Sequence, residues 1–375
     1  MERIYFDNAA TTALAPEVFE AMKPYFMEKF GNPSSIHSYG REVRLAIENA
    51  RKSVASIISA RPSDIIFTSG GTESTNTALH AAVEGLGCKT IITSPIEHHA
   101  TLHTADYLQK SGKATVRYVR LDNHGGIDLN DLEKLLQEST GRCVVTLMHG
   151  NNETGFVTDI EVVGLLCERY NALFHSDIVQ TLAHYPIDVK KLRTHFLSAT
   201  CHKFHGPKGT GLLYADHNLK IEPFIHGGGQ ERNMRAGTEN IYGIIGFAKA
   251  LELAVAEREK TVAQISQLRN HFANRLRHEF PDITFNTPLE QESLINILSV
   301  GFPKTEHSEM LLFNLDIHNI CVSGGSACSS GAQTGSHVIQ ALHPGSDQVT
   351  VRFSFSRYNT IEEADRTIEV LKSIL

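Results

Sequence analysis

The sequence predicts an α/β fold, with a large domain built on a mostly parallel sheet and a smaller α+β domain after it. Short apolar runs of strand length alternate with segments of helical periodicity through the first two thirds of the chain. That alternation is typical of a parallel sheet covered by helices on both faces. Near residue 254 it gives way to a long amphipathic segment, followed by strands and helices in a different order.

The first strong helical signal is the segment "REVRLAIENARKSVASII". Its apolar residues recur at steps of four and three and so share one helix face: Val43, Ile47, Ala50, Val54 and Ile57. The stretch 65–86 comes next, with the apolar run "IIFT", the glycine turn "SGGTESTN" and the segment "TALHAAVEGLG", which ends on glycine. We expect a strand, a turn and a helix there.

Further strands are expected at the apolar runs "TIITS", "CVVTLM", "ALFHSD", "HFLSAT" and "GLLYA". In the last third, "VAQISQLRNHFANRLRHEF" predicts a long amphipathic helix, "SEMLLFNL" a short one and "IEEADRTIEVLKSIL" a closing one, while "LINILSV" and "QVTVRFSFS" predict strands. We therefore divide the chain into an N-terminal segment 1–14 that packs with the small domain, a large domain 15–253 and a small domain 254–375.

Composition narrows the class of protein. A chain of 375 residues is long enough for two or three domains, and its net charge of −7 argues against direct nucleic-acid binding. No apolar run approaches the roughly 20 residues that span a bilayer, so we expect no membrane segment. The six cysteines are scattered without a C-x-x-C motif, which suggests no metal site. Free thiols and the lack of a secretory signal predict a cytoplasmic protein.

Two stretches at expected strand ends suggest cofactor chemistry. In "FLSATCHKFHGPKG" a strand ends just before Lys203, and in "HSDIVQ" an earlier strand ends in Asp177. A pyridoxal phosphate enzyme needs a lysine that bonds to the cofactor and a carboxylate that keeps the pyridine nitrogen protonated. Strand ends at one edge of an open α/β sheet are where ligands bind. Taken alone, the first stretch is equally well explained as a basic surface loop.

Two further stretches are weaker signals. "SGGTE" is a turn that enters a helix, where backbone N–H groups and the Thr72 hydroxyl could hold a phosphate. "IEHHA" offers an imidazole that could stack on a flat ring. Most glycine turns only reverse the chain, and most such histidines lie on the surface.

Cys328 lies in "SGGSACSSGA", among glycines and small polar residues. Structural cysteines usually lie among apolar neighbours, whereas this run favours a loose loop. An exposed thiol on such a loop can ionise to the reactive thiolate. A surface cysteine without function is the alternative.

Taken together, these stretches resemble the pyridoxal phosphate-dependent cysteine desulfurases of the IscS/NifS type, within the class V aminotransferases. The resemblance runs in order through "YFDNAATT", "GNPSSIH", "SGGTESTN", "EHHA", "MHGNNETG", "HSDIVQ", "CHKFHGPKG", "HGGGQERNMRAGTEN", "GGSACSSG" and "RFSFSRYNTIEEAD". It covers almost the whole chain. It implies the aspartate-aminotransferase-type fold, fold type I of the pyridoxal phosphate enzymes.

The resemblance also implies roles for individual residues. Lys203 bonds covalently to the cofactor, Asp177 pairs with its ring nitrogen, Gln180 hydrogen-bonds its ring hydroxyl, and His98 stacks on the ring and moves protons. The phosphate is held by Gly71, Thr72, Thr200 and His202, together with Thr238 from the partner subunit of a homodimer. Asn152 and Arg357 hold the substrate, with Arg357 facing its carboxylate, and Cys328 accepts the sulfur.

The activity implied is conversion of L-cysteine to L-alanine, with the sulfur carried as a persulfide on Cys328 to an acceptor or scaffold protein. Iron–sulfur cluster assembly or other thio-cofactor synthesis would use that sulfur. Three departures from the family pattern stand out: Thr200 replaces the commoner serine, "SSGAQTGSH" replaces a stretch with Leu-Glu-Pro, and the chain ends at "EVLKSIL" without a longer tail. Because of these departures, the sequence does not determine how the Cys328 loop moves or which protein accepts the sulfur.

Two alternatives stay open. One is a different class V aminotransferase or lyase that acts on another small amino acid, for which Cys328 would be dispensable. A selenocysteine lyase belongs with this alternative. The other is a catalytically silent protein that binds pyridoxal phosphate as an assembly module.

Overall fold

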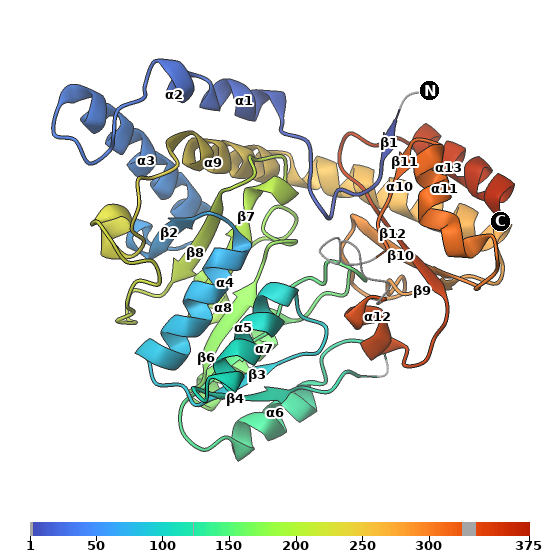
Figure 1. Ribbon diagram of the computed structural model, residues 1–375, viewed down its shortest axis with the longest axis horizontal. Coiled ribbons are helices and arrows are strands. Elements are labelled where there is room, and N and C mark those ends of the chain that lie inside the picture. The colour runs from blue at the N-terminus through green and yellow to red at the C-terminus, as the bar shows by residue number, and fades with distance from the viewer. Residues whose placement is uncertain (1–2, 123, 325–334) are drawn as a thin grey trace.

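The computed structural model describes residues 3–122, 124–324 and 335–375. Cys328 therefore lies outside the described residues. The central sheet has seven strands in the order β2-β8-β7-β6-β5-β3-β4 (Figure 1). These are β2 (Ile65–Thr68), β3 (Thr90–Thr93), β4 (Thr115–Tyr118), β5 (Cys143–Thr146), β6 (Leu173–Asp177), β7 (Phe196–Thr200) and β8 (Gly211–Ala215).

Strands β4, β3, β5, β6 and β7 pair in parallel, and β8 is antiparallel to both of its neighbours, β7 and β2. The predicted mostly parallel sheet is confirmed. Every strand expected from an apolar run is present. Strand β4 was not predicted from the sequence. It lies at the sheet edge and is partly exposed, so it has fewer apolar residues than the buried strands.

Helices cover both faces of this sheet. They are α1 (Pro16–Met22), α2 (Pro24–Met27), α3 (Ser38–Ile57), α4 (Gly71–His80), α5 (His99–Lys110), α6 (Leu129–Glu138), α7 (Ile160–Arg169), α8 (Val189–Leu192) and α9 (Ile241–Ala256). Short 3-10 or π turns occur at η1 (Pro62–Asp64), η2 (Ala81–Gly85), η3 (Cys201–Lys203), η4 (Gln230–Asn233) and η5 (Ser308–Met310).

Strand residues alternate between two hydrophobic cores, one on each face of the sheet. Ile65 and Phe67 of β2 belong to the core that contains residues of α3 and α9, whereas Ile66 belongs to the core that contains residues of α4 and α5. Because both faces are buried, the strands read as continuous apolar runs rather than as alternating ones. Helix α3 buries Val43 and Ile47 in the first of these cores, as its periodicity predicts.

The C-terminal part has a separate core around Phe272 and Phe353. The described residues of this part form the antiparallel sheet β12-β10-β9 and helices α10 to α13, and β11 pairs in parallel with the N-terminal strand β1. The bounds are β1 (Ile4–Tyr5), α10 (Arg258–Glu279), β9 (Thr284–Phe285), β10 (Ile297–Phe302), α11 (Leu311–Ile317), β11 (Ile320–Cys321), α12 (His337–Leu342), β12 (Val349–Ser354) and α13 (Ile361–Ile374).

The N-terminal segment lies against this C-terminal part. Strand β1 pairs with β11, and the ring of Phe6 packs 5.1 Å from that of Phe355. The chain then runs toward Lys203, where Thr12 N–H bonds to the His202 carbonyl at 2.9 Å. The domain limits at residues 15 and 254 stay predictions. Among the described residues, no helix is long and apolar enough to cross a bilayer.

Candidate active site

The carboxyl ends of the parallel strands surround a cavity of about 250 Å³. It is lined by these residues that the sequence singled out: Gly71, Thr72, His98, Asn152, Asp177, Gln180, Thr200, His202 and Lys203. Each follows or ends a strand of the sheet, which explains why residues distant in sequence meet here.

Asp177 ends β6 and is 7% exposed. Its Oδ1 accepts a hydrogen bond from the Val179 N–H at 2.9 Å, and within the described residues no hydrogen bond reaches Oδ2. Burial raises the pKa of Asp177 to about 6, against the opposing effects of the Val179 N–H and the Lys203 charge. Asp177 is therefore ionised at neutral pH and can pair with a cationic group in the cavity.

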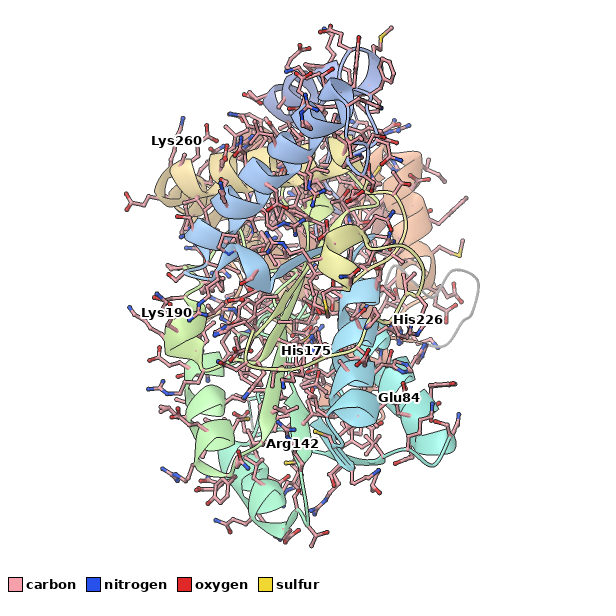
Figure 2. The ribbon with its side chains drawn as sticks, turned by 90° about the vertical axis from the view of Figure 1, so that its left-hand side faces the viewer. Glu84, Arg142, His175, Lys190, His226 and Lys260 are labelled. Carbon is pink, nitrogen blue, oxygen red and sulfur yellow. The ribbon has the colours of Figure 1, made fainter. Side chains whose placement is uncertain are left out.

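A hydrogen-bonded row of buried side chains lies beneath Asp177. His175, two residues earlier on β6, shares hydrogen bonds of 2.8 Å with Thr146 on β5 and with Ser198 on β7. Burial lowers the pKa of His175 to about 3, so it is a neutral core histidine. It lies within the body of the molecule, whereas Lys190 projects from the surface (Figure 2). The row fixes the spacing of the three strands that carry the site.

Lys203 ends the short turn η3 after β7. Its Nζ donates to the carbonyl oxygens of Ala9 and Ala10 at 2.7 and 2.8 Å. Gln180 reaches the same segment, since its Nε2 donates to the Ala9 carbonyl at 3.0 Å. The N-terminal segment therefore forms one wall of the cavity, and its carbonyl oxygens hold the lysine amine.

His98 caps helix α5 from the end of the loop after β3. Its Nδ1 accepts from the Ala100 N–H at 3.0 Å, so the proton of the neutral ring is on Nε2. Burial, together with the Lys203 charge and neighbouring histidines, lowers the pKa of His98 to about 4. The ring is neutral at physiological pH.

The phosphate-binding candidates lie at the other side of the cavity. Helix α4 begins at Gly71, where a Cβ would come within 2.9 Å of Val179, and its first backbone N–H groups have no partners within the helix. Thr200 donates to the Thr210 carbonyl at 2.8 Å, and His202 Nδ1 lies 3.2 Å from Thr11 Oγ1. Thr238 is exposed and lies outside this cavity.

Two arginines of the same stretch have different surroundings. Arg357 lines an adjoining cavity that also includes Lys203, and it is ion-paired with Glu257. Arg352 lines the main cavity and is 1% exposed. Its Nη1 donates to the Asn152 carbonyl at 2.7 Å and its Nη2 to Asp7 Oδ1 at 2.9 Å, while its Nε has no partner among the described residues.

Four residues at the site were given no role from the sequence. Three of them line the cavity, namely His99, His337 and Arg352, and Glu97 adjoins it. A charged residue in the middle of the apolar strand "VTVRFS" was an available signal for Arg352. His337 Nε2 lies 2.9 Å from the Glu97 carbonyl, and its ring centroid lies 4.5 Å from that of His99. Cys328 lies in the stretch 325–334, outside the described residues, and His337, which comes after that stretch, lines the cavity.

These residues fit pyridoxal phosphate. Among the described residues, one oxygen of the buried Asp177 carboxylate and the Arg352 Nε have no hydrogen-bond partner, so the first suits a cationic group and the second an anionic one. The start of α4 offers backbone N–H groups to a phosphate. The described residues contain no group of three or more His, Cys, Asp or Glu side chains placed to hold a metal ion.

The fold and the placement of these groups define a fold type I α/β enzyme of the pyridoxal phosphate class. The chain matches the model of the class V aminotransferase family over residues 4–367 and belongs to that family. A cysteine desulfurase IscS of Dictyoglomus turgidum is 43% identical over 376 residues, covering 99% of this chain and 94% of the relative. A putative cysteine desulfurase IscS 1 of Bacillus subtilis is 43% identical over 369 residues, covering 97% and 96%.

Among solved structures, a NifS-like protein is similar over the full length of both chains, with a TM-score of 0.91 and 40% identity. The resemblance to IscS/NifS-type cysteine desulfurases that the sequence motifs suggested is therefore confirmed, as is the predicted fold class.

Proposed function

We propose that this enzyme is a pyridoxal phosphate-dependent cysteine desulfurase that converts L-cysteine to L-alanine and retains the sulfur on Cys328. The observation that carries the proposal is the convergence of Lys203, the buried Asp177 and Arg352 on one cavity at the strand ends. The names of the relatives, which are cysteine desulfurases, point to the same reaction.

Bound pyridoxal phosphate would supply a protonated ring that takes up the electron pair released at the substrate Cα. Asp177 would hold the ring nitrogen, Gln180 the ring hydroxyl and His98 one ring face, while Lys203 would bond to the cofactor. Gly71, Thr72, Thr200 and His202 would hold its phosphate. Thr200 keeps the hydroxyl that the commoner serine would supply, so this departure preserves the donor.

Arg352 is the better candidate for the substrate carboxylate, in place of Arg357. It lines the same cavity as Asp177 and is fixed by Asp7 and the Asn152 carbonyl, while its Nε has no partner in the part of the chain that the structure describes and can donate to a substrate. Arg357 is already paired with Glu257. Asn152, which also lines the cavity, would assist in orienting the substrate.

Proton movement falls to Lys203 and His98. The Ala9 and Ala10 carbonyls hold the Lys203 amine beside the cavity, where its neutral form can take the Cα proton. His98 is neutral and carries its proton on Nε2, so it can donate that proton to a group in the cavity.

Cys328 would attack the substrate sulfur as a thiolate. A sulfur–sulfur bond forms while the carbon–sulfur bond breaks, and the electron pair left on carbon takes up a proton to give alanine. The enzyme is left with a persulfide. An acceptor or scaffold protein would then take the sulfur for iron–sulfur cluster assembly or other thio-cofactor synthesis, and selenocysteine is a second possible substrate.

A homodimer would complete the phosphate site through Thr238. The stretch 26–36 exposes the apolar side chains of Met27 and Ile36, and the exposed ring of Phe26 stacks 4.3 Å from that of Tyr242, four residues beyond Thr238. Such a surface favours association with a second copy. A cytoplasmic location stays a prediction from the sequence.

The test is to measure alanine and sulfide released from L-cysteine by the wild type and by Cys328→Ala. We expect equal amounts of the two products from the wild type in the presence of a thiol reductant, and almost none from the variant. Turnover of cysteine by Cys328→Ala at the wild-type rate would instead favour another class V reaction.

A further inference from the structure

The segment 229–240 is held against the large domain by one buried and one partly buried ion pair. Glu231 is buried and receives both Nη groups of Arg51 from helix α3, each at 2.8 Å. The same carboxylate accepts from the Phe67 N–H of β2 at 2.9 Å. Arg51 also donates to the Ile65 carbonyl, so one ion pair ties the segment to both α3 and β2.

The backbone of this segment is strained. Glu231, Arg232 and Asn233 have φ values of 43°, 58° and 65°, three consecutive non-glycine residues in the left-handed region. Such a run is uncommon and persists only where surrounding contacts fix it. The Arg51–Glu231 pair and the bond from Arg232 to the Pro62 carbonyl at 2.9 Å are those contacts.

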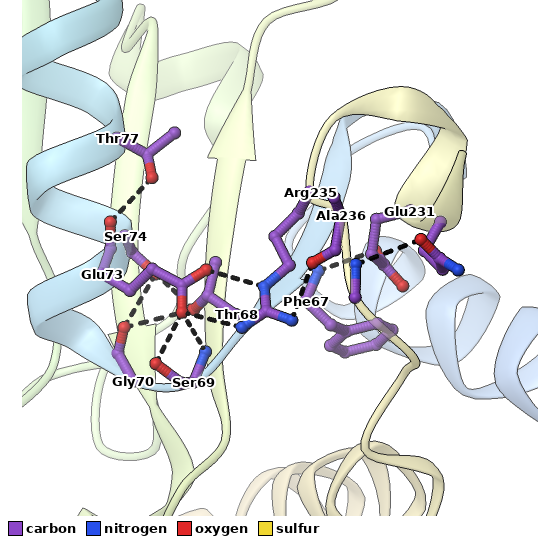
Figure 3. Close-up of polar contacts among 12 residues, drawn as sticks. Phe67, Thr68, Ser69, Gly70, Glu73, Ser74, Thr77, Glu231, Arg235 and Ala236 are labelled. Carbon is purple, nitrogen blue, oxygen red and sulfur yellow. Dashed lines mark hydrogen bonds and ion pairs between the residues drawn. The ribbon is translucent and has the colours of Figure 1, made fainter. Parts of the chain in front are cut away.

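A second ion pair joins the segment to the first turn of α4. Arg235 Nε lies 2.9 Å from Glu73 Oε1 and its Nη2 lies 3.2 Å from Oε2 (Figure 3). Glu73 Oε2 also accepts from the backbone N–H of Ser69 at 2.9 Å and from its hydroxyl. Burial alone would raise the pKa of Glu73, but these bonds from Arg235 and Ser69 lower it below its ordinary value.

Glu73 therefore links two functional stretches. Gly71 and Thr72, the two residues before it, line the cavity, while the Glu73 side chain holds Arg235. Three residues beyond Arg235, Thr238 is exposed, and Asn240 then bonds to Thr210, whose carbonyl holds Thr200. The short span 236–239 is thus fixed at both ends and presents Thr238 outward.

We propose that Arg235 is a positioning residue that couples the two phosphate sites of the dimer. Through Glu73 it fixes the Gly71–Thr72 turn of its own subunit, and through the backbone it fixes Thr238, which in the proposed homodimer would face the partner's cofactor phosphate. The inference rests on the proposed function, because it requires bound pyridoxal phosphate and a homodimer. Cofactor affinity at both sites would then depend on one arginine.

The experiment measures pyridoxal phosphate dissociation from mixed dimers, using the visible absorption of the lysine-bound cofactor. Lys203→Ala removes that signal from one subunit, so each dimer reports a single site. In the first arrangement, Arg235→Ala is in the reporting subunit and Lys203→Ala in the other. In the second, one subunit carries both substitutions and the reporting subunit is wild type. Mixed dimers of wild type with Lys203→Ala provide the reference.

We expect the dissociation constant to rise about tenfold in both arrangements, the loss typical of a charge-assisted pair. An increase in only one arrangement, or in neither, would overturn the coupling. Arg235→Lys, which keeps the charge but loses the two-point contact, should recover part of the affinity. It also keeps the test valid if Arg235→Ala folds poorly.

Two controls separate this effect from a general loss of stability. Arg169→Ala removes a surface ion pair with Glu133 and should leave the dissociation constant unchanged. In a double-mutant cycle, Glu73→Gln and Arg235→Ala should be strongly non-additive for cofactor affinity, and additive values would overturn the link. A wild-type protein that binds no pyridoxal phosphate, or is a monomer, would count against the proposed function instead.

Discussion

Arg352 Nη2 lies 2.9 Å from Asp7 Oδ1, and this ion pair joins strand β12 to the N-terminal segment at the edge of the cavity. The two residues are 345 positions apart in the sequence. The pair fixes the guanidinium so that Nη1 contacts the Asn152 carbonyl and Nε is left without a partner among the described residues. A preformed arginine of this kind suits the carboxylate of an amino-acid substrate.

Arg352→Lys should raise KM for L-cysteine at least about tenfold, because lysine cannot reproduce the planar fork of the guanidinium. Steady-state kinetics with thermal melting as a folding check would measure this. The matched control is Arg357→Lys, which should leave KM within about twofold, because the Arg357 guanidinium is engaged by Glu257. The reverse ranking would return the carboxylate role to Arg357.

Lys203→Ala should abolish the visible absorption of lysine-bound pyridoxal phosphate and lower kcat by about 10³-fold, because the variant loses both the covalent bond and the base. Absorption spectra and alanine release would show this. Lys208→Ala, an exposed lysine five residues later, is the control and should keep both. An unchanged spectrum in Lys203→Ala would refute the assignment.

Cys328→Ala should bind pyridoxal phosphate normally and change its spectrum with L-cysteine, yet release almost no alanine. The thiolate acts only in the chemical step, so kcat and kcat/KM should fall together. Mass spectrometry should find no persulfide on the variant. Cys321→Ala, at a half-buried free cysteine, should turn over within a few-fold of wild type.

The cofactor-free protein should show the cost of ionising Asp177. Its pKa is raised to about 6 in the folded state, so the folded protein favours the protonated carboxyl group. The contribution of this group to the free energy of unfolding is therefore largest at low pH and is lost as the pH rises from about 4 through about 6. Asp177→Asn should therefore gain stability relative to wild type over that window, by about 2–3 kcal/mol at most.

Urea unfolding of both cofactor-free proteins between pH 4 and pH 7.5 would measure this difference. Asp282→Asn, at an exposed position, is the control and should follow the wild type at every pH. Parallel curves for Asp177→Asn and the wild type would mean that burial does not perturb the carboxyl group.

The sequence alone determined the sheet and the two central groups of the site. Its strands could be read because both faces are buried and each strand is apolar throughout, whereas the exposed edge strand β4 lacked that pattern. Lys203 and Asp177 could be placed together because Asp177 ends one parallel strand and Lys203 follows the next, and the carboxyl ends of such strands share one edge of the sheet.

Only the tertiary structure decided which arginine faces the cavity and what holds the Thr238 segment. Arg352 and Arg357 are five residues apart in one stretch, and the direction of each side chain depends on the pairing of β12 with β10 and on contacts with distant Asp7 and Glu257. Arg235 and Glu73 are 162 positions apart, yet form one ion pair. Local sequence sets backbone preference and burial pattern, but contacts between distant side chains exist only once the chain is packed.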